Sequence, residues 1–150
     1  MTIHFRPARL TDLNLLVPMM ADLQKDDPWS VSFEEKRAMI ALRGLIADPS
    51  LGRVWIICDG ANPIGYIVLT FDYSLEYAGK CAWVDEVFVR KQYRGKGIGG
   101  QTLEFFAEEA KRLGVRTIHL EVNHGNPAIE LYRRAGFQDH NRYLMTKWVE

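Results

Sequence analysis

A glycine-rich stretch at residues 94–100, with the sequence RGKGIGG, carries the residue types best suited to holding a charged ligand. Glycines at positions 95, 97 and 99 let the backbone turn tightly and come close to a bound group. The first amides of a following helix have no partner within that helix, so they can bind an anion. Positive charge lies in and just before the stretch, on Arg90, Lys91, Arg94 and Lys96. Together these features predict a binding site for a pyrophosphate group.

The same glycines also satisfy the pattern of dinucleotide-binding folds, through Gly95, Gly97 and Gly100. Glu121 follows about 20 residues later, where a ribose-binding carboxylate is expected. However, residues 90–94 separate the preceding strand from the glycines, and only about 50 residues remain for the further βαβ units of that fold. A P-loop is excluded because the chain has no Gly-Lys-Ser/Thr. A glycine-rich turn without a ligand stays open as an alternative.

The rest of the chain must place this stretch between a strand and a helix. Runs of Val, Ile and aromatic residues predict strands at 3–6, 53–59, 64–73, 80–89, 117–122 and 143–149, and the second and third of these should form a hairpin. Helical spacing predicts helices after Thr11, from a capping box of Ser32 and Glu35 to about residue 47, at 97–113 and at 127–135. Pro18 should kink or end the first helix. This order predicts an α+β fold with a mixed, mostly antiparallel sheet flanked by helices.

Size and charge narrow the class of protein. The 150 residues fit a single domain spanning 1–150, and 47% of them are hydrophobic. Nineteen basic and nineteen acidic residues cancel, which argues against nucleic-acid binding through bulk charge. No apolar run reaches the roughly 18 residues of a membrane helix and no secretion signal is visible, so we expect a cytoplasmic protein without a membrane partner. Cys58 and Cys81 are expected as free core thiols, and no ligand spacing predicts a metal site.

Two motifs resemble those of the GNAT acetyltransferase superfamily. The first is Arg94-Gly95-Lys96-Gly97-Ile98-Gly99, preceded by Val87-Phe88-Val89, which matches the signature Gln/Arg-x-x-Gly-x-Gly/Ala. The second runs from Asn126 to Phe137 and is similar to Asn-x-x-Ala-x-x-Leu-Tyr-x-x-x-Gly-Phe, with Asn126 one residue closer to Ala128 than usual. The resemblance covers nearly the whole chain. It implies the GNAT acyl-CoA N-acyltransferase fold, in which the fourth and fifth strands splay apart.

The resemblance also implies a co-substrate, acetyl-CoA, lying in the gap between those two strands. Backbone groups at the end of the fourth strand would pair with the pantetheine arm, amides of the glycine stretch would hold the pyrophosphate, and Asn126 would touch the pantetheine region. The residues so implied in cofactor binding are Val87, Phe88, Val89, Arg94, Gly95, Lys96, Gly97, Ile98, Gly99, Gly100 and Asn126.

Acetyl transfer to an amine needs a base for the ammonium and an acid for the leaving thiolate. By its place in the second motif, Tyr132 is expected near the thioester sulfur as the general acid, and an aromatic packing role is its alternative.

Asp85 and Glu86 lie just before the cofactor-binding strand residues and are the candidate bases. Adjacent strand residues face opposite sides, so only one of the two faces the substrate. Strict alternation gives two sets, Asp85 with Trp83 and Val87, and Glu86 with Val84 and Phe88. A salt bridge, a substrate-binding carboxylate, or deprotonation through water stays open for both.

The resemblance places the acceptor against the first two helices, their connection, and the loop after the third strand. Acidic and aromatic side chains there suit a cationic amine. They are Asp22, Asp26, Asp27, Trp29, Glu34, Glu35, Tyr73, Glu76 and Tyr77. A polyamine, an amino sugar, an amino acid or a protein amine all remain open, as does an ordinary solvated surface. A non-catalytic acyl-CoA-binding or sensing domain is the alternative function, and similar proteins are often homodimers.

Overall fold

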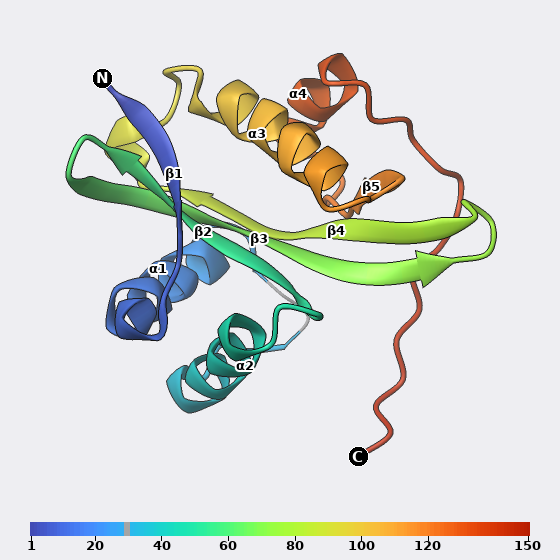
Figure 1. Cartoon of the computed structure of the whole chain (residues 1–150), viewed down its shortest axis with the longest axis horizontal. Helices are drawn as coiled ribbons and strands as arrows, with labels where there is room; N and C mark the ends of the chain where they lie inside the picture. The colour runs from blue at the N-terminus through green and yellow to red at the C-terminus, as the bar shows by residue number, and fades with distance from the viewer. Residues whose placement is uncertain (29–30) are drawn as a thin grey trace.

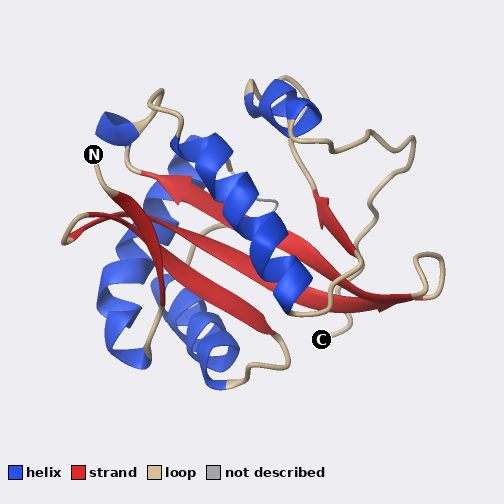
Figure 2. Cartoon of the chain, turned by 45° about the horizontal axis from the view of Figure 1, so that its top comes forward, coloured by secondary structure: helices blue, strands red, loops and turns tan. Residues whose placement is uncertain are grey.

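The computed structural model describes residues 1–28 and 31–150. Within these residues lies a five-stranded sheet in the order β1-β2-β3-β4-β5, antiparallel except for β5, which runs parallel to β4 (Figures 1 and 2). The strands are β1 (Ile3–Pro7), β2 (Gly52–Asp59), β3 (Asn62–Ser74), β4 (Gly79–Val89) and β5 (Thr117–Leu120). The helices are α1 (Leu13–Asp26), α2 (Glu35–Ala47), α3 (Ile98–Arg112) and α4 (Ala128–Arg134). This arrangement confirms the α+β fold and the β2–β3 hairpin.

Helices cover both faces of the sheet, with α1 and α2 on one side and α3 and α4 on the other (Figure 1). Each face has its own apolar cluster: Ile56 and Tyr66 pack with α1 and α2, whereas Ile57 and Ile67 pack with α3. The central strands are therefore buried on both faces, which explains why their sequences are almost continuously apolar. Cys58 and Cys81 are buried and free, as expected. None of the described helices is long and apolar enough to cross a membrane.

The strand expected at residues 143–149 is wrong. After α4 the chain has no regular structure, and it runs past the β3–β4 hairpin and away from the sheet (Figure 1). An ion pair of 3.0 Å between Arg142 and Glu76, in the β3–β4 connection, lies along this path. A strand needs a neighbour to accept its backbone hydrogen bonds. Here Tyr143 and Val149 are almost fully exposed, so the apolar composition of the segment reflects neither pairing nor burial within the described chain.

Two helix signals have different outcomes. The capping box at Ser32 is wrong, because α2 begins at Glu35 and its N-cap is Glu34, whose backbone is extended. Ser32 lies two residues before that cap, beyond the reach of the first free amides of α2. Pro18 does not end the first helix, since α1 runs from Leu13 to Asp26 with Pro18 inside it.

Candidate active site

The neighbouring strands β4 and β5 part at one point, and that point defines the site. β5 pairs with β4 only from Cys81 to Val84, where its register ends at Leu120. On its other side β4 continues to pair with β3 as far as Val89. Within the described residues, positions 85–89 of β4 therefore have no strand on their outer edge. Their backbone groups on that edge can pair with an extended ligand.

A β-bulge lies at the same point. Val68 pairs with Glu86 and Leu69 pairs with Val84, so Asp85 is the extra residue without a partner on β3. The bulge overturns the alternation expected from the sequence: Val84 and Val87 pack in the same cluster, on the α3 face. Glu86 instead bonds to Tyr66, which belongs to the cluster under α1 and α2. The predicted grouping of Glu86 with Val84 is therefore wrong.

A small cavity of about 90 Å³ opens where the two strands part. It brings together the three proposed catalytic residues, Asp85, Glu86 and Tyr132, although they come from β4 and α4. The remaining lining comes from α1, β4 and the end of β5: Leu23, Asp27, Val84, Val87, Leu120 and Glu121.

Glu86 is the carboxylate best placed to act as a base. The hydroxyl of Tyr66, a fully buried residue, donates a 2.7 Å hydrogen bond to its Oε1. Burial raises the pKa of Glu86 to about 7, with the bond from Tyr66 opposing the rise and the charge of Asp85 adding to it. A group with this pKa exchanges protons readily near neutral pH. Burial likewise raises the pKa of Tyr66 well above its usual value, so this hydroxyl stays protonated and can only donate to the carboxylate.

Asp85 differs from its neighbour. Its side chain is exposed at the bulge, and the walls of the cleft still remove enough water to raise its pKa. Within the described residues it has no hydrogen-bond partner, so Asp85 is free to interact with a ligand in the cavity.

Tyr132 faces the cavity from α4. It is half-buried and packs edge-on against Phe137, with ring centroids 5.9 Å apart. Burial, and secondarily the charge of Asp27, raise the pKa of its hydroxyl. No hydrogen bond joins that hydroxyl to another of the described residues. A phenol that stays protonated and has an unused O–H can donate a proton or a hydrogen bond to a ligand.

The glycine stretch links β4 to α3, and its glycines have distinct roles. Gly95 and Gly97 have φ values of 71° and 80°, a left-handed conformation that other residues rarely adopt. Gly97 is the N-cap of α3, so the free amides of the first turn follow it directly. A Cβ on Gly99 would lie 2.8 Å from Leu131 of α4, so this glycine lets the two helices approach. The side chain of Ile98 is buried in the core, which leaves only its backbone to contact a ligand.

The two long cations of this stretch are held by neighbours. Arg94 donates to the carbonyl of Val89 at 2.7 Å and to the carboxylate of Asp26 at 2.6 Å. Lys96 lies 5.6 Å from the ring centre of Tyr93. Asn126, the other side chain implied in cofactor binding, accepts a 2.9 Å bond from the amide of Ala128, the first residue of α4.

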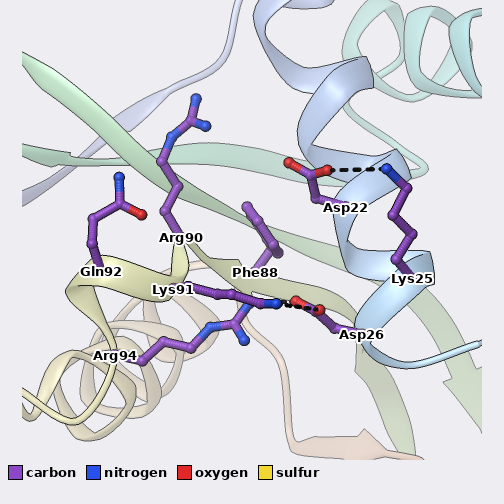
Figure 3. A pocket seen from close by; sticks show the side chains of 8 residues that line it. All are labelled: Asp22, Lys25, Asp26, Phe88, Arg90, Lys91, Gln92 and Arg94. Carbon is purple, nitrogen blue, oxygen red and sulfur yellow. Dashed lines mark hydrogen bonds and ion pairs between the residues drawn. The ribbon is translucent and has the colours of Figure 1, made fainter.

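A second cavity of about 300 Å³ lies between α1 and the segment around the end of β4 (Figure 3). Its lining is mostly charged and comprises Asp22, Lys25, Asp26, Phe88, Arg90, Lys91, Gln92 and Arg94. Of the residues expected around the acceptor, Asp22 and Asp26 line this cavity and Asp27 lines the smaller one. Neither cavity includes Glu34, Glu35, Tyr73, Glu76 or Tyr77, and Trp29 lies outside the described residues. Within residues 1–28 and 31–150, no group of His, Cys, Asp and Glu is arranged to hold a metal ion.

The residue that sequence reasoning missed is Tyr66. It is 20 positions from Glu86, inside an apolar strand whose composition predicts only core packing. Only the register of β3 against β4 brings the hydroxyl to the carboxylate.

The chain is similar in sequence to known N-acetyltransferases. Thialysine N-epsilon-acetyltransferase of Bos taurus is 34% identical over 81 residues, which are 53% of this chain and 47% of that protein. A probable spermine N(1)-acetyltransferase of Bacillus subtilis subsp. natto is 38% identical over 69 residues, 45% of each chain. The chain thus spans about half the length of the curated relatives it matches.

Solved structures extend the likeness to the whole chain. An integron cassette protein from the mobile metagenome of Cole Harbour Salt Marsh has a TM-score of 0.84 and 34% identity, over 97% of this chain and 90% of that one. A predicted acetyltransferase of Clostridium acetobutylicum, whose crystal structure is with acetyl-CoA, shares the fold with a TM-score of 0.80 at 22% identity, over 97% and 96% of the two chains. The model of the Acetyltransferase (GNAT) family matches residues 16–137, from within α1 through the end of the second motif. Because that match covers most of its length, this chain belongs to the GNAT acetyltransferase family.

Proposed function

We propose that this protein transfers the acetyl group of acetyl-CoA to a primary amine of a small molecule, by direct attack in a ternary complex. The observation that carries the proposal is the cavity where β4 leaves β5. Glu86, with a pKa of about 7, and Tyr132, with a raised pKa, line it together. One group can accept a proton while the other donates one at the same pH.

Each end of the co-substrate has suitable partners. The amides that follow Gly97 and the side chain of Arg94 suit a pyrophosphate, since a helix start and a guanidinium both favour phosphate oxygens. The free edge of β4 at residues 87–89 suits the amide groups of the pantetheine arm. These partners would direct the thioester toward the cavity that holds Glu86 and Tyr132.

The chemistry assigned to the two residues balances its protons. Glu86, directly or through a water molecule, takes a proton from the acceptor ammonium, because only the free amine is nucleophilic. The amine nitrogen then bonds to the thioester carbon, the carbon–sulfur bond breaks, and Tyr132 gives its proton to the leaving sulfur. The second proton that the nitrogen must lose passes to the Tyr132 oxygen, so the products are the amide, the thiol and one proton held by Glu86. We assign Asp85 to holding the acceptor, since it is exposed and carries no bond to Tyr66.

The proposed acceptor is a small amine with further charge. The relatives named above act on thialysine and spermine, which supports a charged small molecule over a neutral one. The smaller cavity is lined by four carboxylates, those of Asp27, Asp85, Glu86 and Glu121, and by no Lys or Arg, which supports a cationic group.

An assay of CoA release across a panel of amines tests the function. We expect release with at least one diamine, polyamine or amino acid, and a loss of about 10²–10⁴-fold in kcat for Glu86→Gln. The matched control is Glu108→Gln, which removes an exposed carboxylate of α3 and should leave the rate unchanged. Binding of acetyl-CoA without release across the whole panel would favour a non-catalytic acyl-CoA-binding domain instead.

We also propose that a second copy of the chain covers the apolar C-terminal segment. Tyr143, Met145 and Val149 are each about nine-tenths exposed or more, and the outer edge of β5 has no partner among the described residues. Exposed apolar groups and free strand edges are usually covered. Light scattering should show a dimer that becomes a monomer when residues 138–150 are removed. A monomeric full-length chain would refute this proposal.

A further inference from the structure

The last turn of α1 touches both rims of the proposed active-site cleft. Asp26 accepts a 2.6 Å bond from Arg94, in the glycine stretch after β4. Its neighbour Asp27 accepts a 2.5 Å bond from Asn123, in the segment after β5. The two aspartates therefore connect α1 to the chain on each side of the gap between the strands.

Arg94 has two competing partners. It is the residue assigned above to the pyrophosphate, yet in this structure its guanidinium bonds to Asp26 (Figure 3). A guanidinium pairs more strongly with the several oxygens of a phosphate than with one partly exposed carboxylate. The pair with Asp26 is of that weaker kind, because the two side chains are 28% and 41% exposed. Binding of the co-substrate should therefore take Arg94 away from Asp26.

The loss of Arg94 would leave Asp26 without a close cation. Two other cations lie near it: Lys91 is 3.9 Å away, and Lys25 pairs with Asp22. Their side chains are 80% and 79% exposed, so solvent screens both. The pKa of Asp26 is held below its usual value chiefly by the bond from Arg94, and its carboxylate stays ionised at neutral pH without that bond. A released Asp26 is thus an anion at the edge of the larger cavity.

The charge of that cavity would change when Arg94 leaves Asp26 for the pyrophosphate. Four cations and two carboxylates line it now, a balance that repels a cationic ligand. A bound pyrophosphate would neutralise Arg94 and the cations nearest to it. The α1 side of the cavity would then carry two carboxylates, those of Asp22 and Asp26, and one exposed cation, Lys25, which lies 3.9 Å from Asp22. This net negative charge, opposite the ring of Phe88, suits an ammonium group.

The two cavities follow one another along the same elements. Phe88 lines the larger cavity and Glu86 lines the smaller one. Tyr66 contacts both of these residues: its hydroxyl bonds to Glu86, and its ring centre is 6.0 Å from that of Phe88. Two residues of a strand span about 6.6 Å. A diamine with a short aliphatic chain has a similar length. With one amine at Glu86 it would therefore place its second ammonium beside Phe88, which lines the larger cavity together with Asp26.

We infer that Asp26 anchors the second ammonium of a diamine acceptor and becomes available only after the co-substrate has taken Arg94. This inference rests on the proposed function. It makes Asp26 a specificity-determining residue for the acceptor. Asp26 takes no part in proton transfer.

Calorimetric titration of putrescine tests the inference, with unacetylated CoA as a co-substrate that cannot react and butylamine as a matched monoamine. In the unchanged protein, saturating CoA should tighten putrescine binding by about tenfold or more, within the usual range of coupling between two sites. Butylamine should bind equally with and without CoA. Arg94→Gln frees Asp26 permanently, so putrescine should bind this variant tightly without CoA.

Asp26→Asn provides the complementary result. With CoA bound, the variant should lose its preference for putrescine over butylamine by about tenfold. It should bind CoA at least as tightly as the unchanged protein, because a competitor for Arg94 has gone, and this gain shows that the variant is folded. Glu108→Gln should change none of these values.

Two outcomes would overturn the inference: putrescine affinity that does not respond to CoA in the unchanged protein, or weaker CoA binding by Asp26→Asn. The binding readout is independent of catalysis. If CoA raises the affinity for putrescine but no amine releases CoA from acetyl-CoA, the proposed function fails, and the transfer of Arg94 from Asp26 to the co-substrate stands. If amines are acetylated but CoA does not change the affinity for putrescine, only the proposed release of Asp26 by Arg94 fails.

Discussion

Replacing Tyr66 with phenylalanine tests whether Glu86 is the base. The Tyr66 hydroxyl donates a 2.7 Å bond to the Glu86 carboxylate, and this bond favours the ionised form. Phenylalanine keeps the buried ring and removes only the hydroxyl. Burial and the charge of Asp85 still act on Glu86, so its pKa should rise above about 7.

The size of the shift follows from the strength of the lost bond. A hydrogen bond to a charged group contributes about 1.5–3 kcal/mol, and one pKa unit corresponds to about 1.4 kcal/mol. The pKa of Glu86 should therefore rise by about one to two units. At pH 7 the ionised fraction would fall from about a half to between about a tenth and a hundredth. The rate should fall by about 5- to 50-fold at that pH and recover in alkaline solution.

The measurement is kcat/KM for the best amine as a function of pH, since its acid limb reports the free enzyme. The acid limb should move to higher pH in Tyr66→Phe and stay in place in Tyr143→Phe, which removes a hydroxyl from an almost fully exposed residue. An unshifted profile with normal rates would show that Glu86 is not the base. A loss of rate that is equal at every pH would point to a packing defect instead.

The other predictions concern the acid, the glycine stretch and the stability of the fold. Tyr132→Phe should lower kcat by about 10²–10⁴-fold while calorimetry shows unchanged CoA affinity; a normal kcat would remove Tyr132 from the acid role. Gly97→Glu should abolish CoA binding, because it puts a negative side chain beside the proposed phosphate site, whereas Gly97→Ala should mainly cost about 1–2 kcal/mol of stability for its φ of 80°. Glu86→Gln should stabilise the protein at alkaline pH. The folded pKa of Glu86 is about 7 against a usual 4.5, so ionisation costs about 3 kcal/mol of stability, and this cost appears as pH rises between those values. Urea unfolding at acid and alkaline pH should show that the gain in free energy of unfolding of Glu86→Gln over the unchanged protein shrinks toward acid pH. An equal gain at both pH values would contradict the raised pKa of Glu86.

The parts of the fold that could be predicted depend on local signals. Gly114, with φ of 73°, ends α3, and the apolar spacing before it faces the sheet. The continuous apolar run in β2 follows from burial on both faces. Residues 143–149 have the composition of a strand, but a strand also requires a partner edge, which is a long-range property. The capping box at Ser32 failed for a similar reason, because its spacing is local while the backbone at Glu34 decides where α2 begins.

The site shows the same division. The glycine stretch could be predicted because the conformation at Gly95 and Gly97 is a local property of the residue type. Which of two adjacent carboxylates faces Tyr66 could not, because alternation assumes an unbroken strand. Because Asp85 is one extra residue, every position of β4 before it lies on the face of the sheet opposite to the one that strict alternation from Glu86 predicts. The ion pair of Asp26 with Arg94 likewise joins residues 68 positions apart, and neither sequence neighbourhood predicts the other.

The bulge also explains why a half-buried carboxylate lies in this sheet at all. β4 must pair with β3 along its length and yet part from β5 after Val84. An extra residue bends a strand and increases its local twist, which moves the end of β4 away from β5 and opens the gap. The same bend leaves Asp85 at the surface and Glu86 under α1 and α2, beside the Tyr66 hydroxyl. A single feature of β4 thus produces both the ligand-sized gap and the raised pKa of Glu86. Any change that removes the bulge, such as deletion of Asp85, should therefore abolish CoA binding and amine deprotonation together, whereas Asp85→Asn should leave CoA binding intact.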